Sequence, residues 1–243
     1  MHTPRIFVES GLHCDKKLRL PEAAAHHISK VLRMRPDQKI QVFNGRGGYY
    51  SAIITAIGKK TVDIIPLEFF GEERESNLKI TLVQGISRSQ HMDYTVQKAV
   101  ELGVTNIVPL ITEFCNVQLD EDRGLKKLAH WRSIVIHACE QCGRTRLPEV
   151  FHPAPFMEWI GQDTRRVKII LTPSAGMTMK SITVPDPEIS LLTGPEGGFS
   201  DDEITAAAAA GCQVVNLGSR ILRTETAAVA AVCAVQVLWG DLG

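Results

Sequence analysis

The sequence has no long hydrophobic run: nothing in its 243 residues approaches the roughly 18–20 apolar positions that a membrane-spanning helix needs. The first ten residues, MHTPRIFVES, also lack the apolar stretch of a secretory signal peptide. Aromatic residues make up only 6%, but the 44% hydrophobic and 22% charged residues are ordinary for a globular protein. We therefore expect a cytoplasmic protein with one large domain or two modest ones.

Cysteine is also scarce. The six cysteines are too sparse for a disulfide scaffold in a chain of this length. Cys139 and Cys142 form a single C-x-x-C, whereas a zinc site requires a second pair at matching spacing. The sequence therefore predicts reduced thiols and no metal.

The formal net charge is zero, but the charged residues are unevenly distributed along the chain. Residues 1–72 contain 11 Lys and Arg against 7 Asp and Glu, whereas residues 73–243 contain the remaining 16 against 20. A net charge of +4 beside one of −4 is a weak indication that the first part binds a polyanion such as RNA.

Residues 1–72 have the pattern of a small β-rich barrel with one helix. A strand is expected from Arg5, and residues 39–70 predict three strands separated by the turn signals NGRGG and GKK. Pro21 marks the start of a helix. Its apolar residues recur at helical spacing: Ala25, Ile28, Val31 and Leu32. The charged segment 71–77 is the expected linker.

Residues 73–243 alternate between apolar strands and helices, which predicts a mostly parallel α/β sheet covered on both faces. One helix should carry a capping box of Ser200 and Glu203 and should stop at Gly211. The last helix, from Thr226 to Trp239, is nearly all Ala and Val, with Gln236 as its one polar interruption. Such a helix lies deep inside the domain or also packs on a partner, and we favour a homodimer.

The segment LLTGPEGGFSDDE, 191–203, has the layout of a phosphate-binding loop but carries Glu196 and no lysine. Neither a P-loop motif nor a Rossmann glycine fingerprint is present in the sequence. Glu196 would repel a pyrophosphate, so the ligand should be neutral or cationic near the carboxylate. The alternative is a tight turn in which Glu196 caps the helix that begins near Ser200.

A second glycine loop, NLGSRILRTETAA (216–228), carries Arg220 and Arg223 around a short apolar pair. Loops at the carboxyl ends of parallel strands meet at one edge of a sheet. We therefore expect this loop, the GPEGG loop and the segment after Leu171 to form one pocket. The alternative is that the arginines only solvate a loop.

Several motifs together resemble one family. LLTGPEGGFSDDE, LGSRILRTETAA, QKAVELGVTNIVPL and ACEQCGRTRLPEV are similar to motifs of the bacterial 16S ribosomal RNA (uracil-1498-N3)-methyltransferases, which belong to the SPOUT class. The segments RIFV and HHISKVLRMRPDQKIQVFNGRGGYYSAII resemble that family's PUA-like RNA-binding domain. The resemblance covers nearly the whole chain. It implies a PUA-like β-barrel at 1–72 and a trefoil-knotted SPOUT methyltransferase domain at 73–243.

The resemblance also implies the cofactor, S-adenosyl-L-methionine, which is a sulfonium cation without phosphate. The residues expected to bind it are Thr172, Gly194, Pro195, Glu196, Gly197, Gly198, Leu217, Gly218, Ser219, Ile221, Leu222 and Arg223.

The implied substrate is a uridine in 16S ribosomal RNA of the small ribosomal subunit, methylated at N3. That nitrogen carries a proton at neutral pH, so a base or cationic donors must assist its loss. Arg223, Arg144 and Glu196 are the catalytic candidates, the arginines as electrostatic groups and Glu196 as base or positioner. The candidates for RNA contact are Arg5, Lys30, Arg33, Arg35, Arg88, Lys98, Gln141 and Arg144.

Three other functions are compatible with parts of the pattern. Another SPOUT enzyme, of the ribose 2′-O type, would be expected to show an Asn and Arg signature near the domain start, which we do not find. A non-catalytic RNA-binding dimer is disfavoured because GPEGG and RILRTET are intact. An enzyme of nucleotide phosphates is disfavoured by the missing lysine loop.

Overall fold

The computed structural model describes residues 3–9, 11–115, 120–165, 167–184 and 186–243. The chain folds into two compact units. The first comprises residues 1–75 together with 139–147, and the second comprises 76–138 and 148–243. The sequence pattern gave no indication that 139–147, around the C-x-x-C, pack with the first unit.

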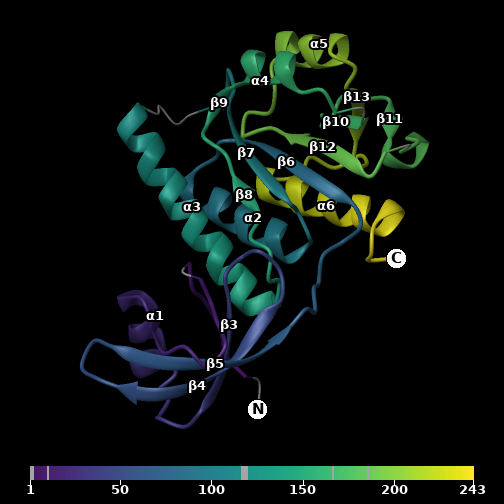
Figure 1. Ribbon diagram of the computed structural model, residues 1–243. Coiled ribbons are helices and arrows are strands. Elements are labelled where there is room, and N and C mark those ends of the chain that lie inside the picture. The colour runs from purple at the N-terminus through teal and green to yellow at the C-terminus, as the bar shows by residue number, and fades with distance from the viewer. Residues whose placement is uncertain (1–2, 10, 116–119, 166, 185) are drawn as a thin grey trace. The chain divides into compact units, whose positions relative to one another are not determined.

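The first unit is built on a five-stranded sheet with the strand order β1-β3-β4-β5-β2 (Figure 1). The strands are β1 (Arg5–Phe7), β2 (Leu18–Arg19), β3 (Lys39–Phe43), β4 (Tyr49–Ile57) and β5 (Val62–Phe70). β1 pairs with β3 in parallel, and the other neighbours are antiparallel. The predicted strand at Arg5 and the three strands of residues 39–70 are therefore confirmed.

One ion-pair cluster lies on this sheet. Asp63 of β5 contacts the Arg19 guanidinium at 2.9 Å and the Lys17 ammonium at 3.0 Å. Hydrogen bonds from Arg19 and then Lys17 lower the pKa of the Asp63 carboxyl to about 2. The cluster therefore keeps Asp63 ionised well into the acidic range.

The predicted helix of the first unit changes its form halfway. α1 (Glu22–His26) begins after Pro21, as expected, but continues into a π-helical turn, η1 (His27–Val31). Ala25 and Ile28 are buried in the core of the sheet. The wider π turn alters the angular spacing of the next side chains. Val31 is 62% exposed and Leu32 39% exposed, so the apolar side chains at helical spacing do not all face the core.

The second unit contains an eight-stranded sheet in which every pairing is parallel. The strand order is β11-β13-β10-β12-β6-β7-β8, and β9 also pairs with β7. The strands are β6 (Lys79–Gly85), β7 (Asn106–Ile111), β8 (Glu149–Val150), β9 (Ala154–Pro155), β10 (Val167–Leu171), β11 (Met177–Thr178), β12 (Glu188–Thr193) and β13 (Gln213–Asn216). The predicted parallel sheet is confirmed.

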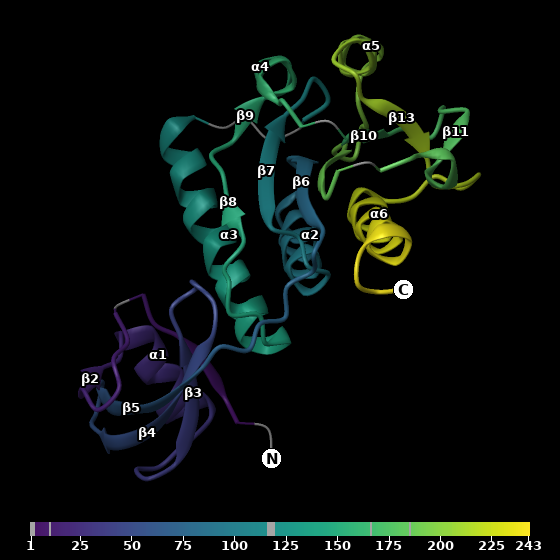
Figure 2. The same cartoon turned by 45° about the vertical axis from the view of Figure 1, so that its right-hand side comes forward.

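The helices of this part of the chain follow the predicted pattern. They are α2 (Ser89–Glu101), α3 (Glu121–Cys142), α4 (Phe156–Gln162), the short 3-10 turn η2 (Met179–Ser181), α5 (Asp201–Ala209) and α6 (Thr224–Trp239). The capping box of Ser200 and Glu203 is present at α5, and Gly211 follows that helix with a positive φ of 84°. Figure 2 shows α6 beside α2, and the two helices are in contact.

The last helix is buried along one side only. Gln236 is fully buried because Ser76 donates to its Oε1 at 2.9 Å and its Nε2 donates to the Leu102 carbonyl at 2.9 Å. Val237 and Leu238 remain 49% and 41% exposed.

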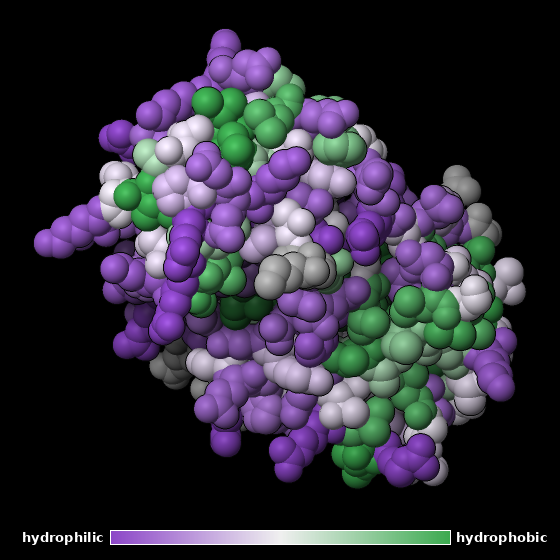
Figure 3. All heavy atoms as spheres, turned by 90° about the horizontal axis from the view of Figure 1, so that it is seen from below, coloured by the Kyte–Doolittle hydropathy of each residue, from purple (hydrophilic) through white to green (hydrophobic). Residues whose placement is uncertain are grey.

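The face of the molecule in Figure 3 is mostly hydrophilic, with hydrophobic residues gathered in separate areas. Within the described part of the chain, no helix is long and apolar enough to cross a bilayer.

Candidate active site

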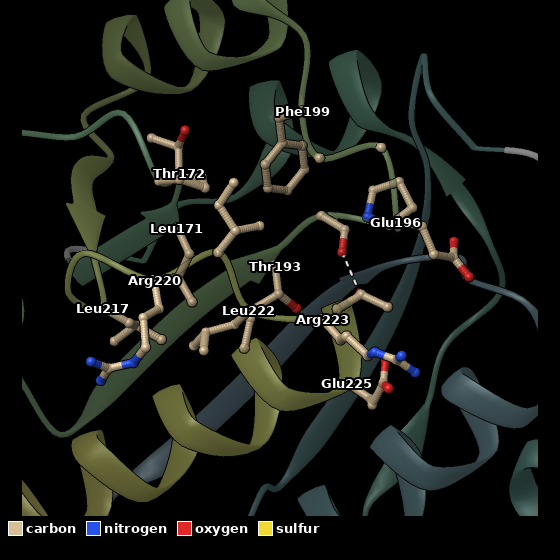
Figure 4. A pocket seen from close by; sticks show the side chains of 18 of the residues that line it. Leu171, Thr172, Thr193, Glu196, Phe199, Leu217, Arg220, Leu222, Arg223 and Glu225 are labelled. Atoms are coloured by element: carbon tan, nitrogen blue, oxygen red, sulfur yellow. Dashed lines mark hydrogen bonds between the residues drawn. The ribbon is translucent and has the colours of Figure 1, made fainter.

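The second unit contains a cavity of about 610 Å³ where three parallel strands end (Figure 4). Thr172 follows β10, the loop 194–199 follows β12, and the loop 217–223 follows β13. These strands are neighbours in the sheet, so their carboxyl ends lie at one edge. A cavity of this size and position is typical of a small-molecule site.

Apolar side chains and the backbone of glycine residues form most of the cavity walls. Leu171, Leu217 and Leu222 line the cavity (Figure 4). Gly198 and Gly218 have positive φ angles of 74° and 100°, and an added Cβ at either would meet no atom within 4 Å. The backbone is therefore open to a ligand at these two glycines. Such a surface suits an uncharged ring system better than a phosphate group.

A buried polar network holds the first glycine loop in place. Gln84, at the end of β6, is fully buried. Its Nε2 donates to the Gly194 carbonyl at 3.2 Å and to the Thr224 hydroxyl at 3.1 Å, while its Oε1 accepts from the Thr193 hydroxyl at 2.5 Å. The Thr224 hydroxyl also donates to the Gly194 carbonyl at 2.6 Å. The network therefore joins β6, the GPEGG loop and the start of α6.

Glu196 does not cap the helix near Ser200, because Ser200 and Glu203 fill that role. Instead its Oε1 accepts a hydrogen bond of 2.9 Å from the backbone N–H of Arg88, the residue just before α2. The carboxylate thus ties the GPEGG loop to the start of α2. Its other oxygen makes no hydrogen bond with any residue that the structure describes.

Charged groups of both signs surround the cavity. Arg220 and Arg223 line it and are exposed, and neither guanidinium has a hydrogen-bond or ion-pair partner among the described residues. His91 and Glu225 also line it, with His91 Nδ1 3.0 Å from Glu225 Oε2. No lysine is among the lining residues. The site therefore offers carboxylates to a cation and free arginines to a carboxylate or a nucleic acid.

The structure brings together eleven of the twelve residues expected to bind the cofactor. They are Thr172, Gly194, Pro195, Glu196, Gly197, Gly198, Leu217, Gly218, Ile221, Leu222 and Arg223. Ser219 is exposed and is not among the lining residues. The shared pocket of the three loops was predictable because each loop follows an apolar strand.

Of the catalytic candidates, Arg223 and Glu196 line the cavity and Arg144 does not. Arg144 belongs to the first unit and is 3% exposed. Its guanidinium forms a two-pronged ion pair with Glu75, with Nη2 2.5 Å from Oε2 and Nε 3.1 Å from Oε1. The Arg144 side chain therefore forms an intramolecular ion pair in this structure.

The RNA-contact candidates of the first unit have different surroundings. Lys30, Arg33, Arg35 and Gln141 are exposed, and Arg33 adopts a positive φ of 51°. Arg5 is half-buried and donates from Nε to Gln41 at 3.0 Å.

In the second unit, Arg88 is exposed and does not line the cavity, but its backbone N–H donates to Glu196, which does. Lys98 is half-buried, pairs with Glu101 at 2.8 Å and lies 5.9 Å from the Tyr94 ring centre.

Several lining residues were not predicted from the sequence, and His91, Phe199, Thr224 and Glu225 are the most informative. Phe199 and Thr224 directly adjoin predicted positions, so their proximity was a usable signal. His91 had no local signal, because it lies on α2, far from both glycine loops in the sequence.

The C-x-x-C lies in the first unit. Burial raises the pKa of the Cys139 thiol to about 12, and Cys142 is half-buried. No group of three or more His, Cys, Asp or Glu side chains is placed to hold a metal ion in the described ranges.

Comparison with known proteins assigns both parts of the chain. Residues 74–236 match the model of an RNA methyltransferase domain, and residues 20–67 match that of an RNA methyltransferase PUA domain. The ribosomal RNA small subunit methyltransferase E of Buchnera aphidicola subsp. Schizaphis graminum is 39% identical over 240 residues, which is 98% of each chain.

Two solved structures are similar over the full length of both chains. A methyltransferase from Legionella pneumophila, in complex with bound S-adenosylmethionine, is 39% identical with a TM-score of 0.97. The ribosomal RNA small subunit methyltransferase E of Neisseria gonorrhoeae, also bound to S-adenosylmethionine, is 40% identical with a TM-score of 0.93. The expected order of a PUA-like domain followed by an α/β RNA methyltransferase domain with a parallel sheet is confirmed. The chain belongs to the ribosomal RNA small subunit methyltransferase E family.

Proposed function

We propose that this protein uses S-adenosyl-L-methionine to methylate N3 of a specific uridine, of the uracil-1498 type, in 16S ribosomal RNA. The observation that carries the proposal is the cavity at the ends of β10, β12 and β13. Its glycine-rich and apolar walls suit an adenosine ring system, and the carboxylates of Glu196 and Glu225 favour a cationic group beside it. The relatives of this chain are named for methylation of ribosomal RNA, and two similar proteins were crystallised with this cofactor.

Each wall has a distinct role in this proposal. Leu217, Ile221 and Leu222 contact the adenosine, and the backbone near Gly198 and Gly218 gives it close access. When bound, the cofactor supplies an electrophilic methyl group. Glu196 holds the GPEGG loop against the start of α2 and favours positive charge nearby. The uncommitted Arg223 guanidinium stabilises the anion that develops on uridine O2 and O4 as N3 loses its proton.

RNA contact is proposed for both units. The exposed cations Lys30, Arg33 and Arg35 of the PUA-like domain supply phosphate contacts, which set affinity and register. Arg88 lies beside the cavity and contacts the target nucleotide or its neighbours.

The site assignment is tested with two variants. The wild-type protein should bind S-adenosylmethionine in calorimetry without added metal. Arg223→Ala should stay folded and bind the cofactor but lose methyl transfer by about 10²–10³-fold, as expected for one removed donor to a developing anion. Arg132→Ala, an exposed arginine that does not line the cavity, is the matched control. Full activity of Arg223→Ala would refute the assigned role.

The substrate is tested on ribosomal RNA from cells that lack the gene. Methylation at N3 blocks base pairing, so primer extension on wild-type RNA should stop at the target. The stop should vanish in the deletion strain and return with the wild-type gene. A stop that persists would show that another enzyme modifies this base.

We also propose that the protein is cytoplasmic, is a homodimer through α6 and has a trefoil knot in its last segment. The half-exposed Val237, Leu238 and Leu242 at the end of the chain support the dimer. The chain crosses from β12 to β13 on the far side of β10 and then returns with α6 against β6 and β12, which is compatible with threading. Sedimentation of wild type and Leu238→Glu tests the dimer; a monomeric wild-type protein would refute it.

A further inference from the structure

A histidine–carboxylate pair lies at the cavity, outside the glycine loops. His91 is on the first turn of α2, and Glu225 is on the first turn of α6. His91 Nδ1 lies 3.0 Å from Glu225 Oε2, and the side chains are 31% and 15% exposed. Both residues line the cavity.

Both partners are fixed by the same structure that shapes the pocket. The start of α2 is bound to the GPEGG loop through the Arg88 N–H and Glu196. The start of α6 is bound to that loop through the Thr224 hydroxyl and the Gly194 carbonyl. The pair is therefore placed relative to the cofactor loop by backbone-anchored contacts, and such preorganisation is what a catalytic group requires.

The free nitrogen of His91 is the informative atom. Glu225 Oε2 lies at ion-pair distance from Nδ1 but forms no hydrogen bond with any described residue, so this carboxylate places negative charge beside the ring without fixing its tautomer. His91 Nε2 makes no hydrogen bond or ion pair with any residue in the described ranges. It can accept a proton when the neutral ring carries its own proton on Nδ1, and a half-exposed imidazole that lines the cavity in this way can act as a general base.

We propose that His91 Nε2 accepts the N3 proton of the target uridine, and that Glu225 is the positioning residue that holds the ring. The inference rests on the proposed function. The N–H bond of uridine breaks and its electron pair stays on N3, which forms the new bond to the methyl carbon. The methyl–sulfur bond breaks and its electrons stay on sulfur, leaving a neutral thioether. The imidazolium then releases the proton to solvent.

The other charged groups around His91 are less suited to this step. Arg223, shown beside Glu225 in Figure 4, is a permanent cation and can only stabilise the developing anion. Arg88, on the same side of α2, is likewise a cation. Glu196 has one carboxylate oxygen bound to the Arg88 N–H. The Glu225 side chain is only 15% exposed, and its Oε2 lies 3.0 Å from His91 Nδ1.

The chain offers a matched control for the histidine. His130 Nε2 lies 2.9 Å from Asp93 Oδ2, a second histidine–carboxylate pair in the same unit that does not line the cavity. His91→Gln should lower the single-turnover rate of methyl transfer by about 10²–10⁴-fold, the usual contribution of a general base. His130→Gln should stay within threefold of wild type. Calorimetry should show that both variants still bind S-adenosylmethionine.

The pH profile separates a base from a structural role. The wild-type rate should reach a plateau with rising pH, as expected for catalysis by an enzyme base. The residual rate of His91→Gln should keep rising with pH, because only solvent hydroxide then removes the proton. A His91→Gln rate within threefold of wild type, with the wild-type profile, would overturn the inference while leaving the proposed function intact. A wild-type protein that binds the cofactor but never methylates RNA would overturn the proposed function and the role of His91 with it.

Nitrogen-15 NMR of the unliganded wild-type protein supplies a measurement on the histidine ring itself. At a pH where the ring is neutral, His91 should carry its proton on Nδ1, with Nε2 unprotonated. Glu225→Ala should shift the ring toward the Nε2–H tautomer and lower the methyl-transfer rate. A wild-type ring protonated on Nε2 would overturn the proposal.

Discussion

Replacing Gln84 by Met tests whether the buried polar network supports both the fold and the pocket. The two side chains have similar volume, so the loss is mainly of hydrogen bonds. The Thr193 hydroxyl loses its acceptor, while the Gly85 and Gly194 carbonyls lose a donor. With about 1–3 kcal/mol for the orphaned hydroxyl and about 1 kcal/mol for each of the two lost carbonyl bonds, we expect the free energy of unfolding to fall by about 3–5 kcal/mol.

All three tryptophans, Trp131, Trp159 and Trp239, lie in the second unit, so their fluorescence reports its unfolding. At a typical slope of about 2 kcal/mol per molar urea, the midpoint should fall by about 1.5–2.5 M. Binding of S-adenosylmethionine should also weaken, because Gly194 loses part of its support. Gln97→Met, on the exposed side of α2, should change neither property. A Gln84→Met protein with a wild-type midpoint and affinity would show that the network is not a support of the site.

Three further predictions concern the first unit. Glu75→Gln should lower the stability of the first unit, measured by hydrogen exchange, by about 3–5 kcal/mol, because the buried Arg144 loses its charged acceptor. Adding Arg144→Met to this variant should recover part of the lost stability. Asp63→Asn should make the unit less stable than wild type at pH 7. Since the folded-state pKa of Asp63 is lowered to about 2, the difference should shrink as the pH falls from about 5 and should disappear only near pH 1. A difference that stays unchanged over this range would contradict the prediction. Burial and a thiol pKa of about 12 should keep Cys139 unreactive toward a disulfide reagent at pH 8 while the exposed Cys14 reacts; equal rates would contradict it.

The sequence predicted those features that depend on short-range patterns. Apolar strands alternating with helices gave the parallel sheet, and Ser200 with Glu203 gave the capping box. The shared pocket followed from one rule, since loops after adjacent parallel strands must meet at the same edge. The π turn at η1 escaped prediction because the apolar spacing of PEAAAHHISKVLRM fits an α-helix, yet Val31 and Leu32 end up exposed.

The sequence by itself determined the two-part organisation and the two glycine loops that line the cavity, because each is encoded in contiguous residues. Only the tertiary structure decided which distant groups became partners. It placed Glu75 against Arg144, so an arginine expected at the active site is enclosed in an ion pair. It placed α2 against α6, so His91 meets Glu225. Such pairs form because burying a polar or charged group is costly unless a partner compensates it, and the partner is chosen by the packing of the chain rather than by its order.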